Sequence, residues 1–209
     1  MEQIILAKHA VSQELWDLLV AIMSDSVFAD FFLVGGTALS LKLGHRQSDD
    51  IDLFCTGNFD ATLVEKHLLK HFEIKRSYCE LNRVSVFSGE VKIDILAHTC
   101  PLLGEIECIE GIRFASLKDI AAMKLNAISG RGLKKDFWDI ATLLNIFTLQ
   151  EMIGFFETKY AQSDTWHLLR SLSYFADAER DETPLINLGQ TTWNQVKIAV
   201  LKAISKVVV

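Results

Sequence analysis

A diglycine followed by two paired aspartates constrains the fold of this chain more than any other feature. A short apolar run at residues 31–34 leads into Gly35-Gly36, and a polar connection further on leads into Asp50-Ile51-Asp52. This pattern predicts a strand, a break at the diglycine, a short helix and a second strand. Because residues two apart on a strand point to the same face, Asp50 and Asp52 are predicted to lie side by side.

The same stretch also predicts a chemistry. Two neighbouring carboxylates repel each other, and a divalent cation between them removes that cost. Glycine amides at the start of a helix can approach phosphate closely, because no side chain stands in the way and the helix dipole favours an anion. An isolated D-x-D is common in acidic surface turns, but here it follows the second glycine by about fourteen residues, after a predicted strand and helix. Together these features indicate a site for metal and phosphate.

Composition indicates a folded globular protein. The chain has 209 residues, of which 50% are hydrophobic and 23% charged, enough for one large domain or two small ones. No apolar run approaches the roughly 18–20 residues that span a bilayer. The first residues carry no basic segment, so we expect a cytoplasmic protein without membrane contact. The four cysteines lack C-x-x-C spacing, which favours free thiols over a zinc site.

The charge distribution limits the kind of nucleic-acid contact. A formal net charge of −6 argues against a general, sequence-blind nucleic-acid binder. Basic residues nevertheless gather between residues 113 and 135, opposed there only by Asp119: Arg113, Lys118, Lys124, Arg131, Lys134 and Lys135. We expect either a basic patch for a small polyanion, such as a nucleoside triphosphate or an RNA end, or an ordinary solvated helical face.

Apolar periodicity divides the chain into two halves. In the first half we expect helices at 4–23, 37–43 and 60–72, and strands at 31–34, 50–54, 73–79, 83–87 and 91–96, with a hairpin over 106–114. In the second half we expect helices at 117–128, 134–145, 150–160, 165–175 and 192–205, and a surface loop at 177–184. The predicted fold is therefore α+β, with a mixed sheet flanked by helices over residues 1–115 and a helical lobe over residues 116–209.

A third carboxylate belongs to the predicted site. In the strand at 91–96, alternation puts Lys92 and Asp94 on one face and Ile93 on the other. A charged residue in an apolar strand needs partners, although an outward charge on an edge strand is the alternative. With Asp50 and Asp52, Asp94 would form a platform for one or two Mg²⁺ ions. Two ions about 3.5–4 Å apart can clamp the attacking and leaving oxygens of a phosphoryl transfer, and Asp94 could act as the general base.

Several other nucleotide and metal sites are excluded by the sequence. There is no G-K-[ST] of a P-loop, no G-x-G-x-x-G of a dinucleotide fold and no G-x-S-x-G nucleophile elbow. A calcium loop beginning at Asp50 would place Phe54 at its fifth position, where an oxygen ligand is needed.

The motifs resemble those of the AbiEii/AbiGii toxin family, whose members are nucleotidyltransferase-like proteins of the DNA polymerase β superfamily. The first motif is the stretch from Gly35 to Phe54, and Lys92-Ile93-Asp94 corresponds to the family's K-x-D. The later helical motifs correspond to residues 117–125 and 135–140, so the resemblance covers about 31–144. The chain departs from the family at Lys135, where an arginine would offer phosphate a bidentate fork, and in carrying aspartate at 119 in the L-x-E segment.

The resemblance implies a polymerase-β-like core that uses NTP with Mg²⁺. It also implies transfer of the nucleotide to RNA, notably to tRNA 3′ ends, by the toxin of a toxin–antitoxin or abortive-infection system with a cognate antitoxin. The predicted catalytic residues and metal ligands are Asp50, Asp52 and Asp94. The predicted nucleotide-binding residues are Gly35, Gly36, Thr37, Arg46, Ser48, Lys92, Lys124 and Lys135. Asp136 and Asp139 are predicted to orient the helical lobe.

Alternatives stay open for both residues and function. Arg46 could instead pair with Asp49 or Asp50, and Asp139 could pair with Lys135 one helical turn away. The acceptor could be a small molecule or a protein side chain. The chain could also be a nucleotide-binding regulatory module without catalysis, although three intact carboxylates argue against such a loss.

Overall fold

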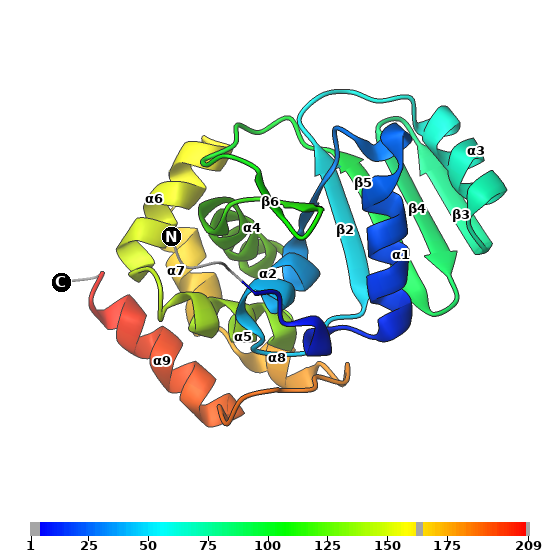
Figure 1. Ribbon diagram of the computed structural model, residues 1–209. Coiled ribbons are helices and arrows are strands. Elements are labelled where there is room, and N and C mark those ends of the chain that lie inside the picture. The colour runs from blue at the N-terminus through cyan, green and yellow to red at the C-terminus, as the bar shows by residue number, and fades with distance from the viewer. Residues whose placement is uncertain (1–4, 162–164, 208–209) are drawn as a thin grey trace. The chain divides into compact units, whose positions relative to one another are not determined.

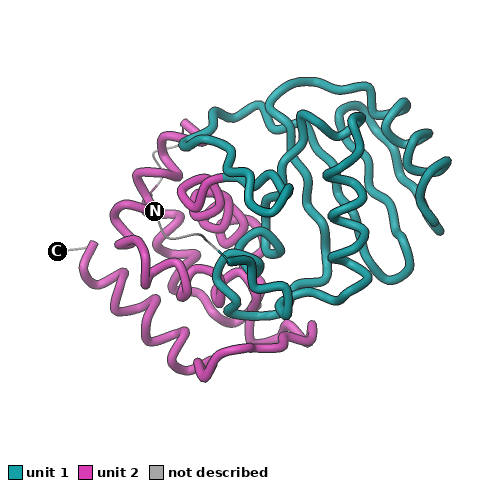
Figure 2. Tube along the Cα trace, in the orientation of Figure 1, with its two compact units in different colours: residues 1–115 teal, residues 116–209 magenta. Residues whose placement is uncertain are grey.

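The computed structural model describes residues 5–161 and 165–207. The chain divides into two compact units, Met1–Ala115 and Ser116–Val209 (Figure 2). Among the described residues, every strand belongs to the first unit, and the second unit is built of helices. No helix in this described part is both long and apolar enough to cross a membrane.

The first unit is organised around a seven-stranded mixed sheet with the order β3-β4-β5-β2-β1-β7-β6. Its strands are β1 Phe32–Val34, β2 Asp50–Cys55, β3 Ile74–Glu80, β4 Arg83–Ser88, β5 Val91–Ala97, β6 Glu107–Ile109 and β7 Ile112–Phe114. The pairs β2–β5 and β1–β7 are parallel, and the remaining pairs are antiparallel. The mixed sheet with flanking helices confirms the predicted α+β class.

Apolar residues alternate along the central strands and bury one face of the sheet. Ile51 and Leu53 on β2, and Ile93 and Ile95 on β5, are fully buried, whereas the residues between them are half-buried. Helices α1 Gln13–Ser24 and α3 Ala61–His71 pack against this sheet (Figure 1). The predicted alternation is confirmed, and it leaves the face with the carboxylates less covered than the apolar face.

The amino-terminal helix is shorter than the sequence pattern predicts. The prediction was one helix over residues 4–23, but α1 begins at Gln13, after a 3-10 turn at Lys8–Ala10, and residue 4 lies outside the described residues. Ser12 sets the boundary, because its hydroxyl accepts a hydrogen bond of 3.1 Å from the amide of Leu15. An N-cap residue has an extended backbone and fixes the start of the helix. The apolar residues before Ser12 therefore do not extend the helix toward the amino terminus. A second 3-10 turn, Ser26–Phe28, follows α1.

Helix α2, Gly35–Leu43, begins at the diglycine and not after it. Gly35 has φ +70°, a conformation that suits glycine and lets the chain turn sharply out of β1. Gly44 closes the helix in the left-handed region, where glycine commonly ends helices, and its amide donates a hydrogen bond of 2.8 Å to the carbonyl of Ser40.

The second unit consists of six helices in its described residues: α4 Leu117–Gly130, α5 Lys134–Leu143, α6 Leu149–Tyr160, α7 Thr165–Ser173, α8 Ala176–Arg180 and α9 Trp193–Ser205. The five predicted helices are confirmed. The predicted surface loop at 177–184 is wrong in its first part, since α8 occupies that segment. Ala178 is fully buried there, and Glu179 pairs with Lys197 at 2.8 Å, so the charged segment is anchored to the helical unit.

Candidate active site

Strand register brings the three predicted carboxylates onto one face of the sheet. In the parallel pair β2–β5, Asp52 lies directly opposite Asp94, and Asp50 lies opposite Lys92. Neighbouring strands are about 4.8 Å apart, so side chains opposite one another on the same face are direct neighbours. The arrangement therefore places one basic and three acidic side chains within two rows of the sheet.

Lys92 binds one carboxylate oxygen of Asp94, and the other oxygen has no hydrogen-bond partner. The ammonium of Lys92 donates a hydrogen bond of 2.6 Å to Asp94 Oδ2, with side chains that are 36% and 15% exposed. The second oxygen, Asp94 Oδ1, is buried without a hydrogen-bond partner. Such an oxygen costs about 1–3 kcal/mol unless a ligand satisfies it. The donor set, hard carboxylate oxygens with one unsatisfied, fits Mg²⁺.

The carboxylates do not by themselves form a finished metal cage. Within residues 5–161 and 165–207, no three acidic, histidine or cysteine side chains converge as ready metal ligands. Mg²⁺ commonly takes only one or two carboxylates and completes its shell with water and substrate phosphates. The residues therefore fit a metal that binds together with a nucleotide better than one held by protein alone.

Gly35 lies tightly against Asp52. Asp52 is the cross-strand partner of Val34, the residue that precedes the diglycine. A Cβ atom built on Gly35 would overlap Asp52 Oδ2 and would lie 3.1 Å from its carboxyl carbon. Only glycine fits here, both because of this contact and because of the positive φ. The turn into α2 therefore lies beside Asp52, one of the three predicted metal ligands.

The guanidinium of Arg46 lies at the second glycine. A Cβ atom on Gly36 would overlap Arg46 Nη2 and would come within 3.2 Å of Ser48 Oγ. Arg46 is buried, and its Nη1 donates a hydrogen bond of 2.8 Å to the carbonyl of Gln47. The start of α2 therefore combines backbone amides with a fixed positive charge, which is a suitable environment for phosphate.

Thr37 connects α2 to the start of β2. Its buried hydroxyl lies 2.9 Å from Ser48 Oγ and also contacts the backbone carbonyl of Asp50. A hydroxyl has a single proton to donate, so these contacts occupy the side-chain donor of Thr37, a residue predicted to bind nucleotide. In this structure Thr37 and Ser48 position the strand that carries Asp50.

The predicted residues of the helical unit form a separate buried cluster. Lys124 on α4 lies 2.5 Å from Asp139 Oδ2 and 3.4 Å from Asp136 Oδ1, and both aspartates are fully buried on α5. Arg131 forms a fork on Asp136, with Nε and Nη2 at 2.8 and 3.0 Å from its two oxygens. Asp139 thus has Lys124 as a partner. The sequence had suggested only Lys135 as a partner for Asp139. Lys135 is half-buried on the same helix.

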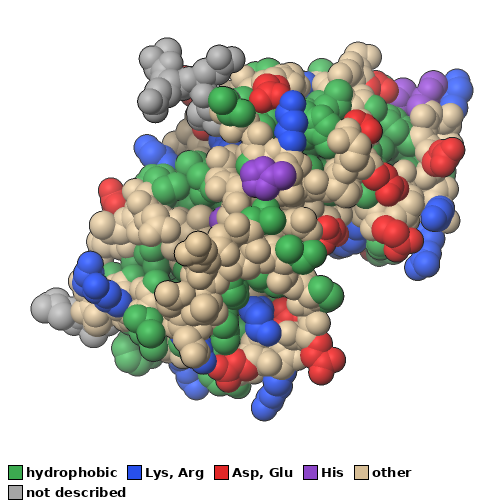
Figure 3. All heavy atoms as spheres, turned by 60° about the horizontal axis from the view of Figure 1, so that its bottom comes forward, with side chains coloured by type: hydrophobic (Ala, Val, Ile, Leu, Met, Phe, Trp, Pro, Cys, Tyr) green, Lys and Arg blue, Asp and Glu red, His purple; other side chains and the backbone are tan. Residues whose placement is uncertain are grey.

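At least three of the six basic residues between residues 113 and 135 are engaged by partners in the folded chain. Arg113 donates to the carbonyls of Met23, Phe28 and Phe31 within the first unit. Lys124 and Arg131 bind the buried aspartates described above. On the face shown in Figure 3, acidic and basic side chains are interspersed. Hydrogen bonds and ion pairs in the folded chain therefore engage side chains that the sequence alone suggested were free.

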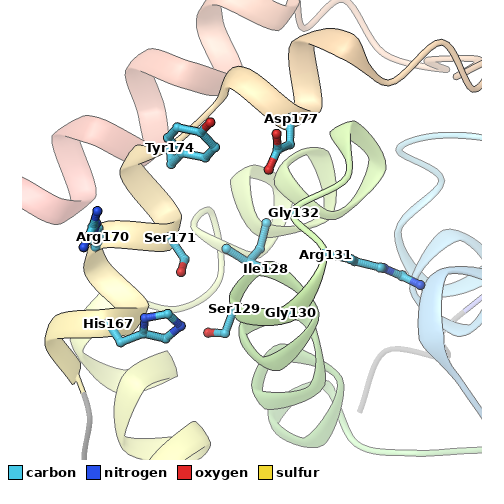
Figure 4. Close-up of a pocket in the computed structure, with 10 residues that line it drawn as sticks. All are labelled: Ile128, Ser129, Gly130, Arg131, Gly132, His167, Arg170, Ser171, Tyr174 and Asp177. Carbon is cyan, nitrogen blue, oxygen red and sulfur yellow. The ribbon is translucent and has the colours of Figure 1, made fainter.

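A cavity of about 270 Å³ lies in the helical unit, between the end of α4 and helices α7 and α8. Figure 4 shows His167 and Ser171 turned toward the end of α4, while the guanidinium of Arg131 points away from them. None of the predicted site residues lines this cavity. No sequence motif marks this cavity, because the residues that line it come from three different helices.

The fold is shared with solved structures that include a nucleotidyltransferase toxin. MenT4, a nucleotidyltransferase toxin from Mycobacterium tuberculosis H37Rv, superposes with a TM-score of 0.59 and 14% identity, over 92% of this chain and 81% of that one. JHP933 from Helicobacter pylori superposes with a TM-score of 0.56 and 17% identity, over 94% of each chain. The uncharacterized protein aq_aa25 of Aquifex aeolicus (strain VF5) is 33% identical over 177 residues, which are 82% of this chain and 86% of the relative.

The family follows from the sequence match. The model of the family described as "Nucleotidyl transferase AbiEii toxin, Type IV TA system" matches residues 17–94 and 89–206. The chain belongs to this family of nucleotidyltransferase toxins, which confirms the resemblance drawn from the motifs. It is a nucleotidyltransferase, an enzyme whose substrate is a nucleoside triphosphate.

Proposed function

We propose that this protein transfers a nucleoside monophosphate from an NTP to the 3′ hydroxyl of an RNA, with the end of a tRNA as the expected acceptor. One observation carries the mechanism: Asp52 and Asp94 face each other across β2 and β5, with Asp50 one row away and the diglycine turn against Asp52. This arrangement supports a metal platform directly beside a phosphate-binding turn. The toxin acts in the cytoplasm, where NTPs and tRNA occur together, and a cognate antitoxin controls it.

Asp50, Asp52 and Asp94 would hold Mg²⁺, and the unpartnered Asp94 Oδ1 is the oxygen that most needs such a ligand. The metal would supply neutralisation of phosphate charge and alignment of the reacting oxygens. The amides of the Gly35-Gly36 turn and the guanidinium of Arg46 bind the terminal phosphates. They hold the leaving pyrophosphate while the α-phosphorus faces the carboxylates.

Asp94 is the proposed general base. The acceptor hydroxyl gives its proton to Asp94 as its oxygen bonds to the α-phosphorus, and the bond from that phosphorus to the bridging oxygen breaks. Pyrophosphate leaves with the electron pair of that bond. Lys92 fixes the orientation of the Asp94 carboxylate through the hydrogen bond to its Oδ2.

Labelled NTP tests the acceptor. The full-length protein, incubated with each radiolabelled NTP, Mg²⁺ and total RNA, is expected to label tRNA-sized species, and chelation of Mg²⁺ should abolish the labelling. An Asp52→Asn variant should lose it as well. Label found on protein or small molecules alone would overturn the RNA assignment and support one of the other acceptors. Absence of transfer, together with a melting temperature raised by NTP, would support the regulatory module.

A further inference from the structure

The face of the sheet that carries the carboxylates continues across two more strands. In the antiparallel pair β4–β5, Ser85 lies opposite Asp94 and Phe87 lies opposite Lys92. In the pair β3–β4, Tyr78 lies opposite Ser85 and Arg76 lies opposite Phe87. Since side chains opposite one another share a face, two rows run from the carboxylates to the sheet edge.

These rows carry aromatic and basic side chains. Tyr78 is 52% exposed, Phe87 is half-buried, and the guanidinium of Arg76 lies over the Phe87 ring at 5.7 Å from its centroid. A third row adds the exposed Arg83 opposite Leu96 of β5. The opposite face of β4 holds its fully buried valines, so this pattern belongs to the less covered side. Aromatic rings beside arginine planes are the side chains on which nucleobases stack.

Charge on this part of the face favours a polyanion. Arg76 and Arg83 contribute two positive groups, while the charge of Lys92 is matched by its ion pair with Asp94. Glu80, opposite Arg83, contributes a negative one and accepts a hydrogen bond from the hydroxyl of Tyr78. The local balance is therefore positive on a chain with a formal net charge of −6. A short single strand, which needs few phosphate contacts, suits such a small patch better than a duplex does.

We infer that Arg76, Tyr78, Arg83 and Phe87 form a platform for the single-stranded end of the RNA acceptor. Bases of the strand stack on Tyr78 and Phe87, and Arg76 and Arg83 bind its phosphates. Tyr78 lies two strands from Asp94, about 10 Å away, so a strand on this platform delivers its terminal hydroxyl to the carboxylates. The inference rests on the proposed function, because it names the surface that presents the acceptor to that site.

A protein strand added to the edge of β3 is the competing occupant. Such a strand would pair with the backbone of β3 and would gain little from Phe87, which lies on β4, one strand inside the edge. RNA would depend on the side chains of both strands. The two occupants therefore differ in which substitutions weaken binding.

Direct binding of RNA tests the platform. A fluorescently labelled single-stranded RNA of roughly ten nucleotides is titrated with the full-length protein, without NTP or metal, and its anisotropy is measured. Tyr78→Ala is expected to weaken binding about tenfold, whereas Tyr78→Phe retains the ring and the affinity. Arg76→Gln should lower the slope of log K against log salt by about 0.7, the value for one lost phosphate contact, and Tyr78→Ala should leave the slope unchanged.

The control is Trp166→Ala, which removes a 75% exposed aromatic side chain from α7 and should bind RNA as the unmodified protein does. Thermal melting checks that each variant folds, and Arg83→Gln is measured in place of any variant that does not. RNA affinity unchanged in Tyr78→Ala and Arg76→Gln, or no binding by the unmodified protein, would overturn the platform.

Transfer kinetics separate the platform from the proposed function. In the labelling assay, Tyr78→Ala should raise the KM for RNA about tenfold and leave the KM for NTP unchanged. RNA that binds through these side chains without being labelled would refute the proposed transfer and keep the platform. Labelling of RNA with an unchanged KM in the variants would keep the transfer and refute the platform.

Discussion

The Oδ2 atom of Asp52 occupies the space that a Cβ atom on Gly35 would need. This contact joins the turn at the start of α2 to the strand that carries two of the three carboxylates. The proposed phosphate-binding turn and the proposed metal platform are therefore in contact, and a change in one should displace the other.

Gly35→Ala should damage both stability and activity. The substitution forces a side chain into the left-handed region and against Asp52, at a cost of about 1–3 kcal/mol. Denaturant unfolding should show this loss, and labelling of RNA should fall even under conditions where the variant is folded. Gly154→Ala is the matched control, because Gly154 lies inside α6 with nothing close to its Cβ position. Alanine there should stabilise the chain by up to about 1 kcal/mol. Equal effects at the two glycines would contradict this account.

Asp94→Asn should abolish transfer and spare the fold. Asparagine keeps the size of the side chain and can still accept the hydrogen bond from Lys92, but it is neutral and cannot take a proton. We expect the rate of nucleotide transfer to fall by at least about 100-fold, the usual contribution of a general base. Rapid-quench measurement of the first turnover would detect this. Asp49→Asn, at an exposed carboxylate just before β2, should retain activity. A normal rate in Asp94→Asn would remove Asp94 from the mechanism.

Local patterns predicted the elements and the orientation of the carboxylates, because alternation and helical spacing are properties of adjacent residues. The sharing of one face by Asp50 and Asp52, opposite the buried Ile51, is confirmed by the burial pattern of β2. The pairing that sets Asp52 against Asp94 joins segments about forty residues apart, and no local pattern encodes it. The sequence suggested a third metal ligand on a neighbouring strand. That Asp94 lies directly opposite Asp52 could be known only once the order of the strands in the sheet was known.

The partners of the charged residues could not be predicted from the sequence for a related reason. The sequence shows that Arg131 and Asp136 are close along the chain, but not that a turn between α4 and α5 brings them into a bidentate contact. It also shows Lys124 without its partners on the next helix. Whether a lysine is a free cation or half of a buried pair depends on tertiary packing, which composition does not determine.

The buried pair of Lys159 and Asp119 should be essential as a pair. Lys159 Nζ lies 2.7 Å from Asp119 Oδ1, both side chains are fully buried, and Ser116 bonds the second carboxylate oxygen at 2.6 Å. Asp119→Ala removes the carboxylate that faces a buried ammonium, which should cost about 3–5 kcal/mol in chemical denaturation. Replacing both residues, with Asp119→Leu and Lys159→Met, should recover most of that loss. If the double variant is as unstable as Asp119→Ala, the charge pair is not the cause.

Acid should destabilise the first unit through Asp25. A hydrogen bond from the amide of Val27, at 2.9 Å, together with His67, 2.6 Å from the other oxygen, holds the pKa of Asp25 below its ordinary value of 3.8. Because the folded carboxyl binds its proton more weakly than the unfolded one, this stabilisation is complete above pH 3.8. It is lost as the pH falls from there through the lowered pKa.

Asp25→Asn should therefore lower the free energy of unfolding at neutral pH and flatten its dependence on pH in that acid range. Urea unfolding at a series of pH values measures both effects, and Asp17→Asn, an exposed change on α1, should leave the acid profile as it is. An Asp25→Asn profile parallel to that of the unmodified protein would show that other carboxyls dominate the acid response.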